Sequence, residues 1–183
     1  MDKLNLLELG ILDWIQTHLQ CAFLDWFFPL ITKLGDSGIF WILTAVVLLL
    51  FKKTRRTGLM MGLALIFGLI VGNLTMKPLI ARIRPYDVNA GVTLLVERLH
   101  DFSFPSGHTL ASFEGAVVLM LRDRRLGTPA MLLAVLIAFS RLYLYVHYPT
   151  DVLAGMLLGT LFAFLAVHIV DALFHKFGKE ETV

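Results

Sequence analysis

Six ionisable residues lie at or near the ends of long apolar stretches of the sequence. They are Lys77, Arg84, His108, Arg141, His147 and Asp151. Ionisable groups are costly beside the hydrocarbon layer of a membrane, and where they occur they usually have a function. Taken singly, Lys77 and Arg84 could simply extend to lipid headgroups, and His147 could be a satisfied interfacial histidine. Two histidines and three fixed cations that face one pocket indicate a phosphate site instead.

The cations suit the charge of a phosphoryl group in transfer. That charge develops on the equatorial oxygens, and preorganised cations and amide N–H groups in a water-poor site stabilise it. Arg84 and Arg141 have planar guanidinium groups that can contact two phosphate oxygens at once, whereas Lys77 acts as a point charge. We therefore predict that Lys77, Arg84 and Arg141 bind phosphate.

The segment Pro105-Ser106-Gly107-His108 is expected to begin a helix. The first N–H groups of a helix and the positive end of its dipole favour an anion. Gly107 would let the backbone come close to that anion, and Ser106 adds a hydroxyl group. This segment therefore predicts an anion-binding turn.

His147 and Asp151 are separated by a short break in which Pro149 suits the first position of a new helix. Asp151 could reach back to His147 and fix its tautomer. A histidine held in this way, with its other nitrogen free, can attack phosphorus and form a phosphohistidine. His108, on another helix, would then protonate the leaving oxygen and later take a proton from water.

Long apolar runs must position these residues. Hydrophobic residues make up 57% of the 183-residue chain and its mean hydropathy is +0.77, well above an ordinary soluble domain. The runs cover residues 38–51, 57–80, 106–121, 129–146 and 152–174, and a transmembrane helix needs roughly 20 residues. We predict an all-α integral membrane helical bundle with five transmembrane helices, forming a single domain over residues 1–183. The polar stretch 82–104 must be a surface loop, because its backbone would be unsatisfied in lipid.

The first 35 residues are less regular. Residues 4–20 are typical of an amphipathic helix at the membrane interface, since Glu8, Asp13 and His18 interrupt their apolar residues. Residues 22–34 are short for a full crossing and contain Asp25 and Pro29, which leaves a sixth span open. The first ten residues lack a basic head followed by a small-residue cleavage site, so we expect no cleaved leader.

Two basic clusters, residues 52–56 and 122–125, lie on one side of the membrane if the spans alternate. The positive-inside rule makes that side the cytoplasm, and His175, Lys176 and Lys179 in the tail agree. The loop 82–104 and the break at 148–150 then face outward together. The net charge of +2 is too small to indicate a nucleic-acid surface. The apolar spans make the bilayer the expected partner. The oligomeric state is left open.

Three sequence motifs combine these residues. The first is a lysine, six residues and Arg-Pro, from Lys77 to Pro85; the second is Pro-Ser-Gly-His, ending at His108. The third is Ser-Arg, five residues, a histidine, three residues and an aspartate, from Ser140 to Asp151. In this order the motifs resemble those of the type 2 phosphatidic acid phosphatase (PAP2) superfamily, which is related to bacterial non-specific acid phosphatases and vanadium haloperoxidases.

The resemblance covers about residues 58–170 and implies an all-helical bundle. It implies that phosphate is bound by Lys77, Arg84, Ser106, Gly107, His108 and Arg141. It also implies that His147 is the nucleophile, Asp151 its orienting partner and His108 the general acid. We expect no metal and no cofactor, because no carboxylate pair or thiol cluster adjoins the histidines in the sequence and the family's phosphatases need no metal.

The strongly apolar spans argue against the soluble branches of the superfamily. The resemblance then implies a small bacterial lipid phosphatase in the inner membrane, with its active site on the extracytoplasmic side. Candidate substrates are undecaprenyl diphosphate, phosphatidylglycerol phosphate, phosphatidic acid and lipid A phosphates. Gly107 stands where the branch dedicated to bacitracin resistance and undecaprenyl diphosphate is expected to have an acidic residue, which weakens that assignment.

Two other classes of function remain as alternatives. A transporter should have charges at the middle of several spans, whereas here only Glu114 lies inside one. A non-catalytic lipid-phosphate-binding protein should have lost one or both catalytic histidines, and both His108 and His147 are present.

Overall fold

The structure, a computed structural model, describes residues 3–177, and every regular element among them is helical. The elements are α1 (Lys3–Leu19), α2 (Ala22–Lys33), η1 (Asp36–Gly38), α3 (Ile39–Leu50), α4 (Arg55–Phe67), η2 (Gly68–Met76), α5 (Lys77–Ile80), α6 (Pro85–Val88), α7 (Gly107–Arg122), α8 (Arg124–Tyr143) and α9 (Pro149–Phe177). The predicted all-α class is confirmed.

The long helices are apolar enough for a membrane. Within residues 3–177, four stretches have the length and composition of a span: Ala22–Leu50, Arg55–Val88, Arg124–Tyr143 and Pro149–Lys176. Helix α7 lies where a further span is predicted, but it has only 16 residues. The protein is therefore a helical multi-pass membrane protein, while a count of five or six spans stays a prediction.

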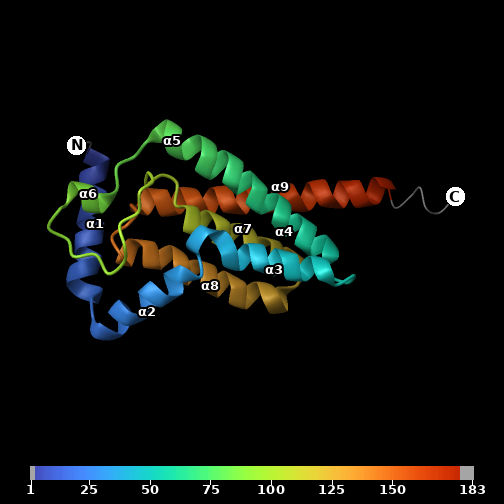
Figure 1. The fold of residues 1–183 in the computed structure, drawn as a ribbon, viewed down its shortest axis with the longest axis horizontal. Helices are drawn as coiled ribbons and strands as arrows, with labels where there is room; N and C mark the ends of the chain where they lie inside the picture. Colours follow the sequence, from blue (N-terminus) through green and yellow to red (C-terminus); the bar gives the residue numbers. More distant parts are fainter. Residues whose placement is uncertain (1–2, 178–183) are drawn as a thin grey trace.

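Helix α7 forms the centre of the bundle and packs against α4, α8 and α9 (Figure 1). Its residues from Thr109 to Leu119 are almost all buried. Helix α9 approaches it closely because Gly159 faces the α7 backbone, where an added Cβ would lie 2.6 Å from the carbonyl oxygen of Leu110. The two helices also meet at their starts, where the N–H of Ser106 donates to the carbonyl oxygen of Asp151 (3.1 Å).

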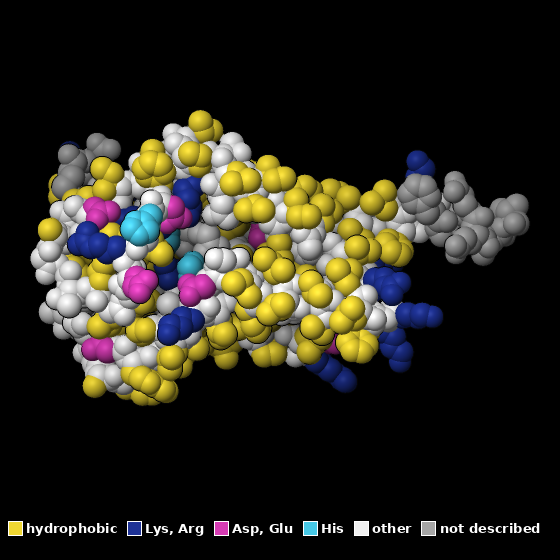
Figure 2. Space-filling model, viewed as in Figure 1, with side chains coloured by type: hydrophobic (Ala, Val, Ile, Leu, Met, Phe, Trp, Pro, Cys, Tyr) yellow, Lys and Arg dark blue, Asp and Glu magenta, His cyan; other side chains and the backbone are white. Residues whose placement is uncertain are grey.

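The two ends of the bundle differ in charge. Arg56 and Arg122 both form ion pairs with Asp171, at 2.6 and 3.7 Å, so the two basic clusters share one end, as predicted. Figure 2 shows lysine and arginine side chains gathered at that end and apolar side chains along the middle. Histidine and acidic side chains surround a hollow at the opposite end. Of the predicted tail signals, Lys179 lies outside the described residues.

The N-terminal helices cover the end of the bundle that has the hollow with its histidine and acidic side chains, which we call the charged end. Helix α1 occupies the predicted segment and packs Leu9, Leu12 and Ile15 against the buried segment 143–148. Its outer face exposes Leu7, Ile11 and other apolar side chains, which suits the predicted position at a membrane interface. Helix α2 packs against α8.

Candidate active site

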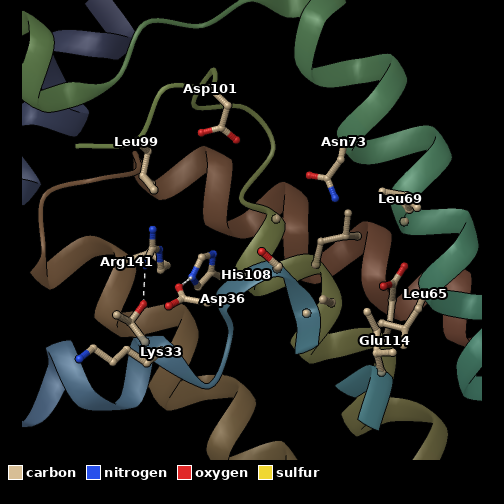
Figure 3. A pocket seen from close by; sticks show the side chains of 18 of the residues that line it. Lys33, Asp36, Leu65, Leu69, Asn73, Leu99, Asp101, His108, Glu114 and Arg141 are labelled. Carbon is tan, nitrogen blue, oxygen red and sulfur yellow. Dashed lines mark hydrogen bonds and ion pairs between the residues drawn. The ribbon is translucent and has the colours of Figure 1, made fainter. Parts of the chain in front are cut away.

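A cavity of about 1520 Å³ opens at the charged end of the bundle. The predicted site residues that line it together are Lys77, Arg84, Gly107, His108, Arg141 and His147. They come from α5, the start of α6, α7, α8 and the α8–α9 connection, so residues 70 positions apart in the sequence share one space. Figure 3 shows His108 and Arg141 facing this cavity, with Asp101 opposite them. Ser106 and Asp151 are fully buried behind its lining.

Lys77 and Arg84 meet at one carboxylate. Lys77 follows the π-helical segment η2, and Arg84 immediately precedes Pro85 at the start of α6. Lys77 Nζ lies 2.5 Å from Oδ2 of Asp101, and Arg84 Nη2 donates to Oδ1 of Asp101 (2.6 Å). Arg84 is further fixed by carbonyl oxygens, since its Nε donates to Asp101 (2.8 Å) and its Nη1 to Val146 (2.7 Å). Sequence reasoning missed Asp101, which lies in the predicted loop without a motif of its own.

His147 is buried beside Arg84. Its Nε2 lies 3.3 Å from Nη1 of Arg84, and its Nδ1 lies 3.4 Å from Oγ of Ser103 and 3.5 Å from Oδ2 of Asp151. The predicted approach of Asp151 is present, but 3.5 Å is longer than an ordinary hydrogen bond. Ser103, which sequence reasoning missed, donates to Asp151 (2.5 Å) and lies on the same side of the ring. Burial first, then the charges of Arg84, Arg141 and Lys77, lower the pKa of His147 well below its ordinary value of 6.5.

Asp151 has other strong partners. Its Oδ1 accepts a hydrogen bond from Nη1 of Arg82 (2.5 Å), and its Oδ2 accepts one from the N–H of Tyr148 (2.9 Å). Arg82 also lies over the ring of Tyr148 and pairs with Glu8 of α1 (2.5 Å). Glu8 in turn accepts two hydrogen bonds from Thr150, both 2.7 Å. Helix α1 is thereby tied to Asp151, the predicted partner of His147, and in the sequence only the charge of Glu8 among the apolar residues around it could have suggested this connection.

The start of α7 holds the second histidine. His108 Nε2 is hydrogen-bonded to Oδ1 of Asp36, from η1, at 2.8 Å. The hydroxyl groups of Ser106 and Thr109 are hydrogen-bonded to each other (3.0 Å), and Ser106 immediately precedes the first residue of α7. Gly107 packs against Asn73, and an added Cβ there would come within 2.9 Å of the amide oxygen. The predicted role of Gly107, close approach of the backbone to an anion, stays a prediction.

Arg141 approaches the cavity from the opposite side. Its guanidinium is buried and donates from Nη1 to the hydroxyl of Thr32 in α2. Its Nε has no hydrogen-bond partner within residues 3–177. A buried guanidinium with an unused donor is suited to an anionic ligand, because an unpaired buried donor costs free energy.

The cavity continues between α3, α4 and η2 as an apolar groove. Side chains such as Ile42, Val46, Leu65 and Leu69 line it. Glu114 lies at this part of the cavity, buried, and its Oε1 has no hydrogen-bond partner among the residues that the structure describes. Figure 3 shows Glu114 well apart from the cluster of His108, Asp36 and Arg141. A charged end joined to an apolar groove fits a molecule with a phosphate headgroup and a hydrocarbon tail.

The described residues contain no group of three or more histidine, cysteine, aspartate or glutamate side chains that could hold a metal ion. The positive charge beside His147 comes from arginine and lysine instead. Activity without a metal stays a prediction that chelation tests.

A family model for the PAP2 superfamily matches residues 57–174 of the sequence. The chain belongs to the PAP2 superfamily. A curated relative, the undecaprenyl-diphosphatase of Sulfolobus acidocaldarius, is 35% identical over 151 residues, covering 82% of this chain and 72% of the relative.

Two solved structures have the same fold as this PAP2 protein. LpxE of Aquifex aeolicus matches with a TM-score of 0.78 and 29% identity over 88% of this chain and 95% of LpxE. A transmembrane PAP2-type phosphatidylglycerolphosphate phosphatase of Bacillus subtilis matches with a TM-score of 0.76 and 26% identity, over 94% of this chain and 88% of that chain. The matched family region contains all three motifs, whereas Glu8, Thr32 and Asp36 lie before it.

Proposed function

We propose that this PAP2 protein transfers the terminal phosphate of a membrane lipid to His147 and then to water. Membership of the superfamily and its lipid phosphatase relatives make the chain a membrane lipid phosphatase. The phosphohistidine route and the role of each residue are our proposal.

The position of His147 supports this route most. Its Nε2 lies 3.3 Å from a guanidinium nitrogen of Arg84, at the cavity, while its Nδ1 faces Ser103 and Asp151. The Nδ1–H tautomer directs the proton toward these oxygens and leaves the Nε2 lone pair for phosphorus. The lowered pKa of His147 favours the neutral ring that attack requires.

In the first step the Nε2 lone pair forms a bond to phosphorus, and the bond from phosphorus to the leaving oxygen breaks. His108 gives its proton to that oxygen, which leaves as the lipid alcohol or the lipid monophosphate. Lys77, Arg84 and Arg141 stabilise the charge on the equatorial oxygens. Asp151 balances the positive charge that develops on the phosphorylated imidazole.

In the second step water attacks the phosphohistidine. Neutral His108 takes a proton from that water as its oxygen bonds to phosphorus, and the bond between phosphorus and Nε2 breaks. Inorganic phosphate leaves, and both histidines return to their starting states. The two steps need no redox partner and no metal.

The substrate is a phosphate with a long hydrocarbon tail. The apolar groove beside the charged end of the cavity supports a lipid over a soluble phosphate ester. A polyprenyl diphosphate is the first candidate, since the Sulfolobus acidocaldarius relative is an undecaprenyl-diphosphatase, and this similarity outweighs the argument from Gly107 against that substrate. Phosphatidylglycerol phosphate is the second, because the Bacillus subtilis structure of similar fold is a phosphatase for that lipid.

Phosphate release from a panel of lipids tests this function. Purified protein in detergent is given undecaprenyl diphosphate, phosphatidylglycerol phosphate, phosphatidic acid and a lipid A phosphate, with His147→Ala as the matched control. We expect release from at least one lipid by the wild type and none by the control. No release from any lipid, or equal release by both proteins, would contradict the proposed function.

We also propose that the charged end faces the outside of a bacterial cell membrane, since both basic clusters lie at the other end. Cys21 is replaced by serine, and single cysteines are introduced as Gly91→Cys and Lys53→Cys. An impermeant maleimide should label position 91 on intact cells and position 53 only after permeabilisation. The reverse pattern would mean that the site faces the cytoplasm.

A further inference from the structure

Asp101 engages two of the cations that a substrate phosphate needs. It lies in the loop between α6 and α7, and its two carboxylate oxygens contact different partners, Lys77 at 2.5 Å and Arg84 at 2.6 Å. A phosphate group bound at the same cations would also present one oxygen to each. The Asp101 carboxylate and a phosphate group would therefore occupy the same two cations, Lys77 and Arg84.

Asp101 carries a negative charge near neutral pH. Burial alone would raise its pKa, but the hydrogen bond and charge of Lys77, followed by those of Arg84, outweigh burial and lower the pKa to about 2. Protonation therefore cannot release the two cations near neutral pH. They become free only if the side chain turns away.

The surroundings of Asp101 allow such a turn. Its side chain is 51% exposed, whereas Lys77 and Arg84 are largely buried at 11% and 2%. The backbone carbonyl oxygen of Asp101 separately holds Nε of Arg84. The carboxylate can consequently rotate into solvent while the loop and the guanidinium stay in place.

We infer that Asp101 is a built-in competitor of the substrate phosphate: its carboxylate occupies Lys77 and Arg84 and must be displaced before a phosphate binds both. The identity of the displacing ligand rests on the proposed function. Competition lowers the apparent affinity of any phosphate by the fraction of molecules in which the cations are free. The same factor applies to a monophosphate and to a diphosphate headgroup, so Asp101 lowers the affinity for both without selecting between them.

The test measures competitive inhibition by inorganic phosphate in Asp101→Asn, using the purified full chain. Asparagine keeps the shape of the side chain and the backbone carbonyl that holds Arg84, but it removes the charge. The inhibition constant for phosphate should fall about 5- to 20-fold, a range that takes account of the exposure of Asp101. The KM for a monophosphate lipid and the KM for a diphosphate lipid should fall by similar factors.

Asp87→Asn is the matched control. Asp87 lies on α6 near the same loop and pairs with Arg98 at 3.0 Å. The substitution therefore removes one negative charge from the same end without altering the contacts of Lys77 and Arg84. Its inhibition constant for phosphate should stay within about twofold of the wild type, since exposed charges act weakly.

An unchanged or raised inhibition constant in Asp101→Asn overturns the inference, as does an equal fall in Asp87→Asn. If the asparagine variant does not fold, Asp101→Ser must give the same fall. Calorimetric titration with inorganic phosphate separates this inference from the proposed function, because it needs no turnover. Tighter binding by Asp101→Asn in a protein that hydrolyses none of the lipids would refute the proposed function alone. Lipid hydrolysis with unchanged phosphate binding would refute the inference alone.

Discussion

Asp36 is predicted to support the general acid, and Asp36→Asn isolates that contribution. The carboxylate of Asp36 lies 2.8 Å from Nε2 of His108. An anionic partner stabilises the protonated imidazole, which is the form that donates a proton to the leaving oxygen. Asparagine can still accept a hydrogen bond from this nitrogen, so the substitution removes the charge and keeps the contact.

The expected loss is small and can be worked out from the contact. A hydrogen bond to a charged group contributes about 1.5–3 kcal/mol and a neutral one about 0.5–1.5 kcal/mol, a difference of about 1 kcal/mol. Asp36 is 58% exposed, and solvent screening at an exposed carboxylate keeps the expected loss near this 1 kcal/mol rather than above it. A loss of about 1 kcal/mol corresponds to roughly a fivefold lower rate. His108→Ala removes the acid itself and should cost about 10²- to 10⁴-fold.

The leaving group decides how much of this loss appears. An alkyl oxygen leaves poorly without a proton, whereas p-nitrophenolate leaves readily, so both variants should lose more kcat/KM on a lipid alkyl phosphate than on p-nitrophenyl phosphate. The assay is the ratio of kcat/KM for the two substrates in wild type, Asp36→Asn and His108→Ala, with Asp87→Asn as the charge control. Equal losses on both substrates would refute the assignment of His108 as general acid.

Three further predictions concern the nucleophile and metals. His147→Ala should abolish turnover on both substrates, and a labelled phosphoenzyme that persists in this variant would show that another residue is the nucleophile. Because the pKa of His147 is lowered, its ring should stay neutral as the pH falls below the ordinary value of 6.5, and NMR titration of the labelled imidazole should place its protonation well below that pH. A titration at or above 6.5 would contradict the burial and charge argument. Turnover should survive EDTA, since arginine and lysine supply the positive charge; loss in EDTA that magnesium or zinc restores would show a metal requirement.

The N-terminal helices have a larger part in the site than their sequence suggests. Glu8 reaches Asp151 through Arg82, Thr32 binds Arg141, and Asp36 binds His108. The three motifs lie after residue 57, so a reading based on them leaves these partners out. Pairings between segments more than 70 residues apart depend on how α1 and α2 pack, and no local pattern encodes that packing.

The sequence by itself determined the helical class, the shared end of the two basic clusters and six of the residues that line the cavity. Apolar runs of sufficient length favour helices in lipid because each helix satisfies its own backbone hydrogen bonds. Only the tertiary structure decided which carboxylates face the cations. Asp101 and Asp36 have ordinary sequence neighbourhoods, and their proximity to Lys77, Arg84 and His108 results from loop and helix packing. The structure also showed that Ser103 shares the contact between Asp151 and His147, because hydrogen bonding depends on tenths of an ångström that residue spacing does not specify.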